Sequence, residues 1–271
     1  MMEDYFILSK CGQGTYGSVF KAIHKSSNTL VALKQISDVA QEDGTPVEIK
    51  YLVQLRDLPN IVYLRDYFYS QVDGNNVLFL VMEYIEGDLW KIMSNPQCSL
   101  TIGQIKLFTR QLLEAVKQCH IKGIMHRDIK PANLLIDLNG ELKLTDFGLS
   151  TSYTHKYEKY LSNNVVSLYY RPPELLLGTI AYGPEIDMWS VGCILMEMIN
   201  NSYLFAGSDE TGQLDLIFKM FGYPNEKSWP GIAQLPGWNS YINRKQQSTS
   251  PSSSLTSTPS SSPCPYSLTI K

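Results

Sequence analysis

The sequence predicts an α+β protein in which a small antiparallel sheet precedes a mostly helical region. Up to about Tyr84, short β-rich runs alternate with turn signals. The runs are YFIL, SVFKAI, LVALKQI, IVYLRDYFY and, after VDGNN, VLFLVMEY. They indicate about five antiparallel strands, interrupted by one helix at residues 46–56. After Gly87 the apolar period changes to three or four residues, which is typical of amphipathic helices.

Two long helices are expected in the second region. From Thr101 to Lys122, apolar residues recur at three- and four-residue steps and give one buried stripe. From Pro184 to about Asn200, the segment EIDMWSVGCILMEMI is apolar nearly all round, so this helix should lie centrally in the core.

The C-terminal end differs in composition. From Ser248 to Lys271, 24 residues include ten Ser, four Thr and four Pro, too little apolar surface to offset the entropy of ordering. We therefore divide the chain into residues 1–84, residues 85–242 and a disordered Ser/Thr/Pro-rich tail at residues 243–271.

Composition excludes several classes of function. The formal net charge of -3 argues against a nucleic-acid-binding surface. The five cysteines are far apart and form no C-x-x-C pair, which disfavours a zinc site and a disulfide framework and fits a reducing compartment. No signal peptide and no apolar run of roughly 18 residues is present. We expect an intracellular protein of the cytoplasm or nucleus that binds no membrane.

A glycine-rich segment, GQGTYGSV, lies between the first two expected strands. Gly12, Gly14 and Gly17 would let a hairpin backbone approach an anion closely, although glycine-rich turns are common. The next strand contains VALK, which ends on Lys34. Taken alone, Lys34 reads as an ordinary exposed strand lysine.

Two later motifs point to phosphoryl transfer. In HRDIKPANLL, Asp128, Lys130 and Asn133 supply a base, a cation and a metal-ligating amide on one tight loop. In LTDFGLS, Asp146 supplies a carboxylate for the same metal. Phosphoryl transfer needs charge neutralisation and in-line positioning, which these residue types provide. Their order and spacing make isolated, solvated loop charges an improbable explanation.

Together these motifs resemble those of the eukaryotic protein kinases, most closely the cyclin-dependent kinases of the CMGC group. The resemblance runs from residue 4 to about residue 240. It rests on GQGTYGSV, VALK, EIKYL, LVMEYIEGDL, HRDIKPANLL, DFG, VVSLYYRPPELLLG, EIDMWSVGCI and LFAGSDETGQLDLIFKMFG. RPPELLLG is also similar to the transcription-associated branch. The resemblance implies a bilobal protein-kinase fold, with a small antiparallel-sheet N-lobe, a mostly helical C-lobe and ATP-dependent protein serine/threonine kinase activity.

The resemblance also implies an ATP site and its residues. The backbone from Glu83 to Ile85 would face adenine, with Met82 behind it and Asp88 near the ribose. The implied ATP-binding residues are Gly12, Gln13, Gly14, Gly17, Val19, Ala32, Lys34, Met82, Glu83, Ile85, Asp88 and Leu135.

The catalytic roles follow from the same resemblance. Asp128 would accept the proton of the substrate hydroxyl and Lys130 would steady the transferring phosphoryl group. Lys34 would pair with Glu48, while Asn133 and Asp146 would hold Mg²⁺. HRDIK resembles serine/threonine rather than tyrosine kinases, and VVSLYYRPPE, Arg171 included, resembles kinases that act on Ser or Thr followed by Pro. A cyclin-like regulatory subunit is the implied partner, beside the protein substrate.

Some positions depart from the family pattern. Ser162 stands where relatives carry a regulatory phosphorylated threonine, but Arg127 is the only one of three arginines that would receive its phosphate. Val47 and Thr151 occupy the other two places. A phosphate on Ser162 should therefore order the segment less strongly than in relatives.

The C-lobe also lacks an ion pair that relatives have. In relatives, an arginine pairs with the glutamate of the PPE motif, here Glu174, and the only arginine after Arg171 is Arg244. We therefore expect a truncated C-lobe in which Glu174 has no cationic partner. A pseudokinase-like binding module, a truncated gene product and a small-molecule phosphotransferase of related fold remain the alternatives.

The segment EDGTPVEIKYL carries two interpretations of Glu48. On a helix that starts at Pro46, Glu48 shares a face with Leu52 and Leu55, so it needs a cation such as Lys34. Alternatively, Thr45 to Glu48 forms a capping box, in which Glu48 folds back on the helix end. Relatives place about one more helical turn before this glutamate, and that turn contributes to the cyclin-binding surface.

Overall fold

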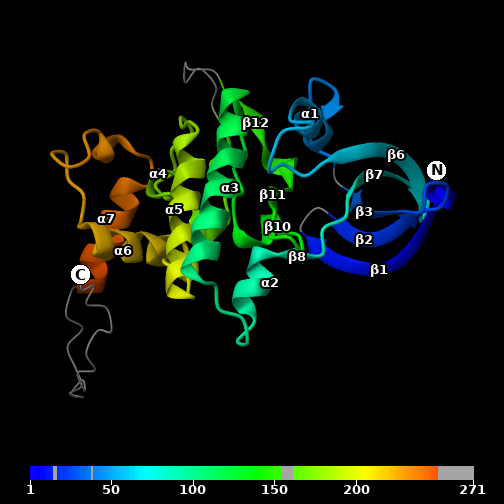
Figure 1. Cartoon of the computed structure of the whole chain (residues 1–271). Coiled ribbons are helices and arrows are strands. Elements are labelled where there is room, and N and C mark those ends of the chain that lie inside the picture. The colour runs from blue at the N-terminus through cyan, green and yellow to red at the C-terminus, as the bar shows by residue number, and fades with distance from the viewer. Residues whose placement is uncertain (15–16, 38, 154–160, 250–271) are drawn as a thin grey trace, which may run out of the picture.

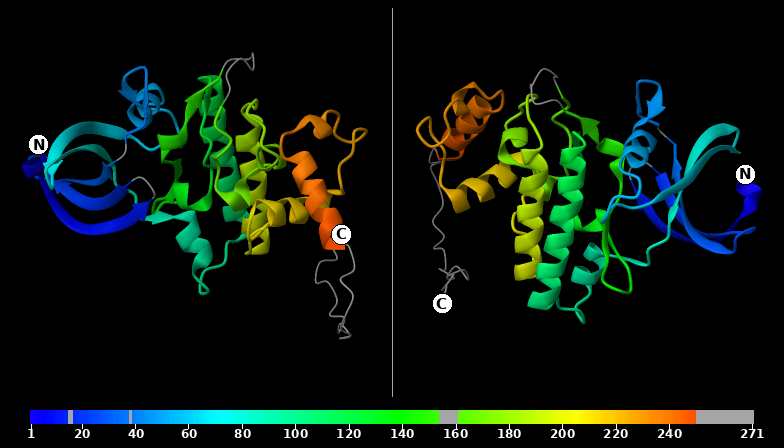
Figure 2. Two further views of the ribbon diagram at one scale, coloured as in Figure 1. Left: turned by 180° about the vertical axis from the view of Figure 1, so that it is seen from behind. Right: turned by 45° about the horizontal axis from the view of Figure 1, so that its top comes forward.

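The N-terminal part of the chain folds into a five-stranded antiparallel sheet. The computed structural model describes residues 1–14, 17–37, 39–153 and 161–249. The sheet has the order β1-β2-β3-β7-β6 and consists of β1 (Tyr5–Gly14), β2 (Gly17–His24), β3 (Thr29–Ile36), β7 (Asn75–Glu83) and β6 (Leu64–Val72). The sheet and the helical lobe lie end to end (Figures 1 and 2). The predicted sheet of about five strands is confirmed.

A two-residue turn fixes the register of β6 and β7. Asp73 and Gly74 both have positive φ, 50° and 79°, and join Val72 to its partner Asn75. A turn with positive φ at both central residues matches the twist of antiparallel strands, which explains the preference for Asp-Gly. One face of the sheet buries Phe68 and Phe79, whose rings stack with centroids 5.3 Å apart.

An Asp-Gly turn also forms a second hairpin, just before the first helix. Strands β4 (Gln41–Glu42) and β5 (Thr45–Pro46) pair across Asp43 and Gly44, which have φ of 53° and 75°. Helix α1 (Val47–Gln54) begins immediately afterwards, and Val47 N–H donates to the carbonyl of Ala40 at 2.9 Å.

The capping-box interpretation of this segment is wrong. Thr45 lies in β5, the residue at the helix N-cap is Pro46, and no side chain caps the helix start. The Asp43–Gly44 hairpin takes Thr45 out of the capping position, so Glu48 is not drawn back to the helix end.

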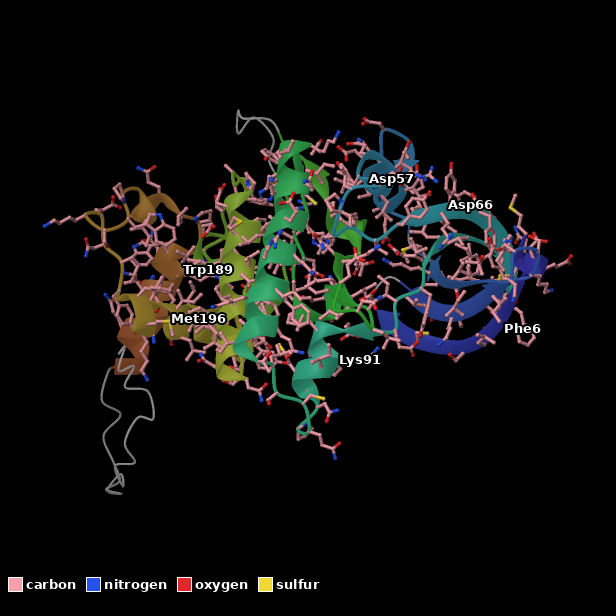
Figure 3. The ribbon with its side chains drawn as sticks, viewed as in Figure 1. Phe6, Asp57, Asp66, Lys91, Trp189 and Met196 are labelled. Atoms are coloured by element: carbon pink, nitrogen blue, oxygen red, sulfur yellow. The ribbon has the colours of Figure 1, made fainter. Side chains whose placement is uncertain are left out.

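The C-lobe is built around two packed helices, α3 (Ile102–Ile121) and α5 (Glu185–Asn200). Both expected helices are confirmed, and α3 begins with a capping box between Thr101 and Gln104. The remaining helices are α2 (Leu89–Ser94), α4 (Pro173–Leu176), α6 (Glu210–Phe221) and α7 (Trp238–Thr249). Trp189 of α5 lies in this lobe (Figure 3), and its ring stacks on that of Phe205 with centroids 6.2 Å apart.

Short strands at the inner edge of the C-lobe carry the loops of the cleft. Strands β11 (Leu142–Leu144), β10 (Leu134–Ile136) and β8 (Gly87–Asp88) form one sheet, and β12 (Thr151–Ser152) pairs with β9 (Ile124–Met125). Val62 N–H donates to Leu144 O, and Leu144 N–H donates to Asn60 O, so main-chain bonds join the lobes.

The chain end differs in part from expectation. Helix α7 continues to Thr249, so the boundary expected at residue 243 falls inside a helix. The rest of the expected disordered tail, residues 250–271, lies outside the described residues. Among the described helices, none has both the length and the apolar surface that a bilayer crossing requires.

Candidate active site

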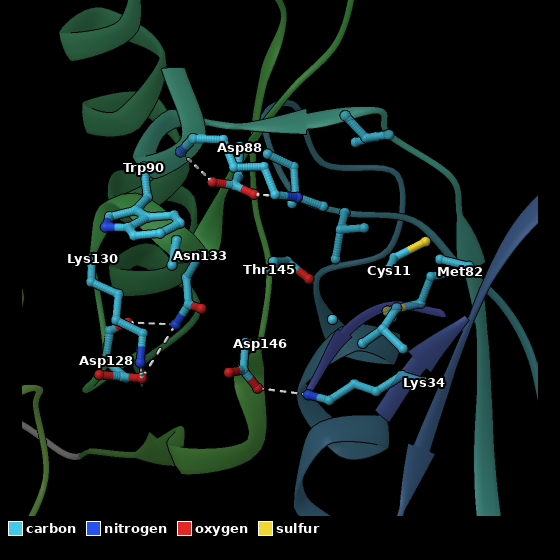
Figure 4. A pocket seen from close by; sticks show the side chains of 18 of the residues that line it. Cys11, Lys34, Met82, Asp88, Trp90, Asp128, Lys130, Asn133, Thr145 and Asp146 are labelled. Atoms are coloured by element: carbon cyan, nitrogen blue, oxygen red, sulfur yellow. Dashed lines mark hydrogen bonds and ion pairs between the residues drawn. The ribbon is translucent and has the colours of Figure 1, made fainter. Parts of the chain in front are cut away.

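A cleft of about 820 Å³ separates the two lobes. The sheet forms one wall and the short strands and loops of the C-lobe form the other (Figure 4). The predicted site residues that line it are Gly12, Gly17, Val19, Ala32, Lys34, Met82, Glu83, Ile85, Asp88, Asp128, Lys130, Asn133, Leu135 and Asp146. Segments more than 100 residues apart in sequence therefore meet at one site.

Lys34 lies at the centre of the charge network. Its Nζ donates to both carboxylate oxygens of Glu48, at 2.8 and 2.7 Å, and to Oδ1 of Asp146 at 2.6 Å. Glu48 is only 4% exposed and lies behind Lys34 on α1. The interpretation of Glu48 as the partner of Lys34 is confirmed, and the exposed-lysine interpretation of Lys34 is wrong.

Burial and charge act in opposition on these groups. Burial disfavours the Lys34 ammonium, but Glu48 and Asp146 outweigh it and raise the pKa of Lys34. Burial raises the pKa of Glu48, although Lys34 opposes this shift. Burial also opposes ionisation of Asp146, but Lys34 lowers the pKa of this carboxyl. One lysine thus serves two carboxylates, and its charge favours the ionised form of both.

Asp128 is held from two sides. Its Oδ2 accepts from Lys130 Nζ at 2.6 Å and from Asn133 Nδ2 at 3.3 Å. Its Oδ1 accepts from the hydroxyl of Ser167 at 2.8 Å and from the backbone N–H of the same residue at 3.1 Å. Asp128 is therefore held between the loop that carries Lys130 and the segment that carries Ser167.

A buried carboxylate on α5 supports the loop around Asp128. Asp187 accepts from the backbone N–H groups of His126 and Arg127, both at 2.9 Å, and from His120 Nε2 at 2.9 Å. Arg127 has φ of 67°, a left-handed conformation that costs roughly 1–2 kcal/mol in a residue with a Cβ. The bonds to Asp187 hold the backbone in this conformation.

Two side-chain oxygens in the cleft have the chemistry of divalent-cation ligands. Asn133 Nδ2 donates to Asp128 O at 2.8 Å, which fixes the amide so that its oxygen points away from that loop. Neither this oxygen nor Oδ2 of Asp146 accepts a hydrogen bond within the described parts of the chain. Both side chains face the same gap (Figure 4). Amide and carboxylate oxygens suit Mg²⁺, which completes its shell with water and phosphate oxygens.

The glycine-rich hairpin approaches β3 closely at one point. Gly17 has φ of 152°, and a Cβ on it would lie 1.7 Å from the carbonyl oxygen of Gln35. A Cβ on Gly12 would meet nothing within 4 Å, so the backbone there faces open space. Gln13 and Gly14 pair with Ser18 and Gly17 in the hairpin, and Thr15 and Tyr16 lie outside the described residues.

The segment from Glu83 to Ile85, between the lobes, has fewer free backbone hydrogen-bonding groups for adenine than the sequence predicts. Glu83 N–H donates to Tyr63 O at 3.0 Å, so it is not available to a base, and the Glu83 carboxylate binds Lys143 at 2.9 Å. Ile85 N–H and C=O have no hydrogen-bond partner among the described residues. Asp88 caps α2 through Lys91 N–H at 2.8 Å and pairs with the Lys91 ammonium at 3.0 Å.

A left-handed residue also lies in the activation segment, which we define as the stretch from Asp146 to Glu174. Val166 has φ of 64°, and its carbonyl accepts from Arg171 Nε at 2.9 Å. Ser162 is exposed and outside the cleft, and its carbonyl accepts from the hydroxyl of Tyr182. Arg127 donates to the same hydroxyl at 3.1 Å. Arg127 and Ser162 are therefore linked through Tyr182.

Three residues near the site had no role in the sequence analysis. Ser167 and Trp90 line the cleft, and Asp187 supports the catalytic loop. An acidic residue inside the otherwise apolar segment EIDMWSVGCILMEMI was a usable signal for Asp187, because buried carboxylates need partners. Nothing in the local pattern distinguished Ser167 or Trp90.

Comparison with known proteins decides the family. The family model described as protein kinase domain matches residues 5–258. The chain belongs to the protein kinase family. Cyclin-dependent kinase 20 of Danio rerio is 41% identical to this kinase domain over 242 residues, which covers 88% of this chain and 69% of the relative. The chain is therefore a kinase domain of the cyclin-dependent-kinase type, as the motifs predict.

Other relatives of this kinase domain are longer. A Dictyostelium discoideum protein, provisionally named a cyclin-dependent serine/threonine-protein kinase, is 76% identical over 244 residues, or 90% of this chain. Cyclin-dependent kinase C-2 of Arabidopsis thaliana is 41% identical over 86% of this chain. The chain spans 36% of the first relative and 48% of the second.

Two solved assemblies contain chains of the same fold. A chain of the CAK complex from Chaetomium thermophilum bound to ATP-γ-S has a TM-score of 0.77 and 40% identity, covering 87% of this chain and 74% of that chain. A chain of the yeast RNA Pol II CTD kinase CTDK-1 complex has a TM-score of 0.76 and 34% identity, covering 92% and 83%. The bilobal kinase fold expected from the sequence is thus confirmed.

Proposed function

We propose that the protein is an ATP- and Mg²⁺-dependent protein serine/threonine kinase. The observation that carries the proposal is the buried Lys34–Glu48 pair, which faces Asp128, Asn133 and Asp146 across one cleft. In kinases the lysine–glutamate pair and the metal-binding aspartate must both be in place for phosphoryl transfer. Here Lys34 is paired with Glu48, and Asp146 lies in the same cleft within hydrogen-bond distance of Lys34, which supports the proposal.

Each residue has a role in this proposal. Lys34 binds the inner phosphates of ATP, and Asn133 with Asp146 would hold Mg²⁺, which supplies charge neutralisation at the transferred phosphoryl group. Asp128 accepts the proton of the substrate hydroxyl. Lys130, bonded to Asp128 at 2.6 Å, stabilises negative charge beside the acceptor. The free N–H and C=O of Ile85 would bind the adenine edge.

The activation segment supports a preference for Ser or Thr followed by Pro. The carbonyl of Val166 is turned away by its φ of 64° and is already bonded to Arg171. A substrate residue that follows the acceptor therefore finds its N–H without an acceptor, which costs about 1–3 kcal/mol when buried. Proline has no N–H and avoids this cost.

The proposal includes regulation by a partner and by phosphate. The name of the Danio rerio relative favours a cyclin-like subunit, although the Asp43–Gly44 hairpin occupies the place where relatives extend the helix. Ser162 is the candidate phosphosite, with Arg127 as its cation. Because Val47 and Thr151 replace the other two arginines, a phosphate there gains fewer charge-assisted bonds.

The test compares phosphotransfer from Mg-ATP to peptides that differ only in Ser-Pro or Ser-Ala. The wild-type chain should phosphorylate the Ser-Pro peptide, and Asp128→Asn and Asp146→Ala should reduce the rate by at least about 100-fold. Equal rates for wild type and both variants would refute the proposal. Equal use of both peptides would refute the proline preference alone. Thermal unfolding with and without Mg-ATP measures nucleotide binding separately, because a ligand of the folded state raises Tm.

A further inference from the structure

Trp90 is an exposed tryptophan on the wall of the catalytic cleft. All four tryptophans lie in described residues, and Trp90 is the one that is exposed, at 45%. Its ring stacks on no other ring, and its indole N–H has no hydrogen-bond partner among the described residues. A large apolar side chain that lines a cleft without an internal partner is available to a ligand.

The place of Trp90 in the cleft favours contact with the peptide substrate over contact with the nucleotide. It belongs to α2, which packs against the 3-10 turn at Pro131–Asn133. Figure 4 shows it on the wall that also carries Lys130 and Asn133, on the side of Lys130 nearer Asp88. Trp90 therefore lies beside the groups that act on the acceptor hydroxyl.

The bonds of Asp128 define the direction of the peptide. Oδ1 of Asp128 faces Ser167 of the activation segment, and Oδ2 faces Lys130 of the catalytic loop. Val166, which favours proline after the acceptor, adjoins Ser167. A peptide that places this proline at Val166 and its hydroxyl at Asp128 continues on the other side, past Lys130 toward α2. The residues that precede the acceptor thus reach Trp90.

The charges around Trp90 determine which substrate side chains can bind there, among the residues that precede the acceptor. Asp88 is paired with Lys91 at 3.0 Å, Asp128 with Lys130 at 2.6 Å, and Glu86 with Lys21 at 3.2 Å. Each acidic group on this side of the cleft already has a lysine partner. A basic substrate side chain would find no unpaired carboxylate, whereas an apolar one can cover the indole ring.

We propose that Trp90 is a specificity-determining residue that packs an apolar side chain located two or three residues before the phosphorylated Ser or Thr. This inference rests on the proposed kinase activity and names a substrate feature of the same site. Partial burial of one leucine against the ring corresponds to about tenfold in binding or in kcat/KM.

The test uses Ser-Pro peptides with leucine, alanine or lysine at the second and third positions before serine. Wild type should favour leucine by about tenfold over alanine in kcat/KM, with lysine no better than alanine. Trp90→Ala should lose this preference, and Trp90→Phe should keep most of it. The KM for ATP should be unchanged in both variants. The matched control is Tyr69→Ala, which removes a side chain of β6 that is 46% exposed and lies outside the cleft.

Two kinetic results would overturn the inference. One is an undiminished leucine preference in Trp90→Ala, and the other is a raised KM for ATP with an unchanged peptide preference, which would assign Trp90 to the nucleotide. Fluorescence anisotropy measures the affinity for a labelled leucine peptide in the presence of Mg-ATP, and this measurement does not require turnover. Weaker peptide binding by Trp90→Ala than by wild type supports the inference. If no phosphate is transferred, that result contradicts the proposed function and leaves the binding result valid. Equal peptide binding by Trp90→Ala and wild type refutes the inference.

Discussion

The hydroxyl of Tyr51 accepts a hydrogen bond of 2.7 Å from the backbone N–H of Ser152. The same hydroxyl donates to the carboxylate of Glu42 on β4. Tyr51 is fully buried on α1, and Ser152 lies on β12 of the activation segment. Burial raises the pKa of Tyr51, so the hydroxyl keeps its proton. This bond joins the helix that carries Glu48 to the segment that follows Asp146.

Tyr51→Phe should lower kcat/KM by about fivefold to tenfold. The variant keeps the ring in place but loses the bond to Ser152, and one such bond contributes about 1 kcal/mol. Steady-state kinetics with the Ser-Pro peptide measures the effect. Tyr67→Phe, at an exposed position of β6, is the control. Unchanged kinetics in Tyr51→Phe would mean that the helix is held without this bond.

Glu48→Gln should reduce kcat/KM by at least about tenfold. A neutral side chain leaves Lys34 paired with Asp146 alone, which draws Asp146 away from its role as a metal ligand. The expected signature is a raised requirement for Mg²⁺, seen when the rate is titrated against its concentration. Glu114→Gln, a glutamate of α3 paired with Lys117, is the matched control. Full activity of Glu48→Gln at low Mg²⁺ contradicts the role of the pair.

Asp187→Asn should lower both stability and kcat. The amide presents an NH₂ group to one of two backbone N–H donors, and an unsatisfied buried donor costs about 1–3 kcal/mol. Arg127 would then relax from its left-handed conformation and shift Asp128. Thermal unfolding and kinetics test the two effects, with the exposed Asp66→Asn as control. A change in Tm without a change in kcat would separate Asp187 from catalysis.

Glu174→Gln should stabilise the protein at neutral pH. Burial raises the pKa of Glu174 above its ordinary value of 4.5, and no ion pair with the described residues compensates, because Arg244 binds Thr211 at 2.6 Å. The folded state therefore binds the Glu174 proton more tightly than the unfolded state, so stability falls as pH rises through this range. Gln removes the penalty, and a gain of roughly 1 kcal/mol raises Tm by about 2–4 °C.

The pH dependence provides the control for Glu174. The advantage of Glu174→Gln should diminish as the pH falls through 4.5, the ordinary carboxyl pKa, and should disappear well below it, where the carboxyl is protonated in both states. Glu226 shows the opposite shift, because the backbone N–H groups of Gly231 and Ala233 lower its pKa. Glu226→Gln should therefore lower Tm at neutral pH. A stabilisation by Glu174→Gln that does not change with pH would exclude ionisation as its cause.

Gly17→Ala should raise the KM for ATP by about tenfold, equivalent to about 1.4 kcal/mol. The new Cβ cannot stand 1.7 Å from Gln35 O, so the hairpin must move away from β3 and from the cleft. Gly192→Ala in α5 is the contrast, because its Cβ meets nothing within 4 Å. It should add about 0.5–1 kcal/mol of stability without a change in kinetics. An unaltered KM for Gly17→Ala would contradict the closeness of the hairpin to β3.

Local patterns were sufficient for much of this structure. Alternation and turn residues predicted the sheet, and the spacing of Asp128, Asn133 and Asp146 predicted the chemistry, because a short loop and the strand pair beside it bring these residues together. The segment Asp43–Thr45 carries two competing signals, a hairpin turn and a capping box, and the capping box is the incorrect one. The Asp-Gly hairpin prevails over the capping box because strand pairing fixes Thr45.

Contacts between distant segments could not be predicted in this way. Glu83 N–H is bonded to Tyr63, and Ser167 reaches Asp128 from 39 residues away. No periodicity within either segment encodes these distances, since they depend on how the lobes and the activation segment pack. The same holds for Trp90, whose exposure depends on how α2 packs against the turn at Pro131–Asn133.

Helix α1 has only eight residues, Val47–Gln54. Helices shorter than about 12–15 residues are marginal in water, so most of its stability comes from contacts made by its buried side chains. If Lys34 and Ser152 released it, the segment would lose those contacts and unravel rather than swing outward as a rigid rod. Inactivation of this kinase domain would then be a local order–disorder transition, in which the catalytic glutamate is withdrawn by melting the helix that carries it.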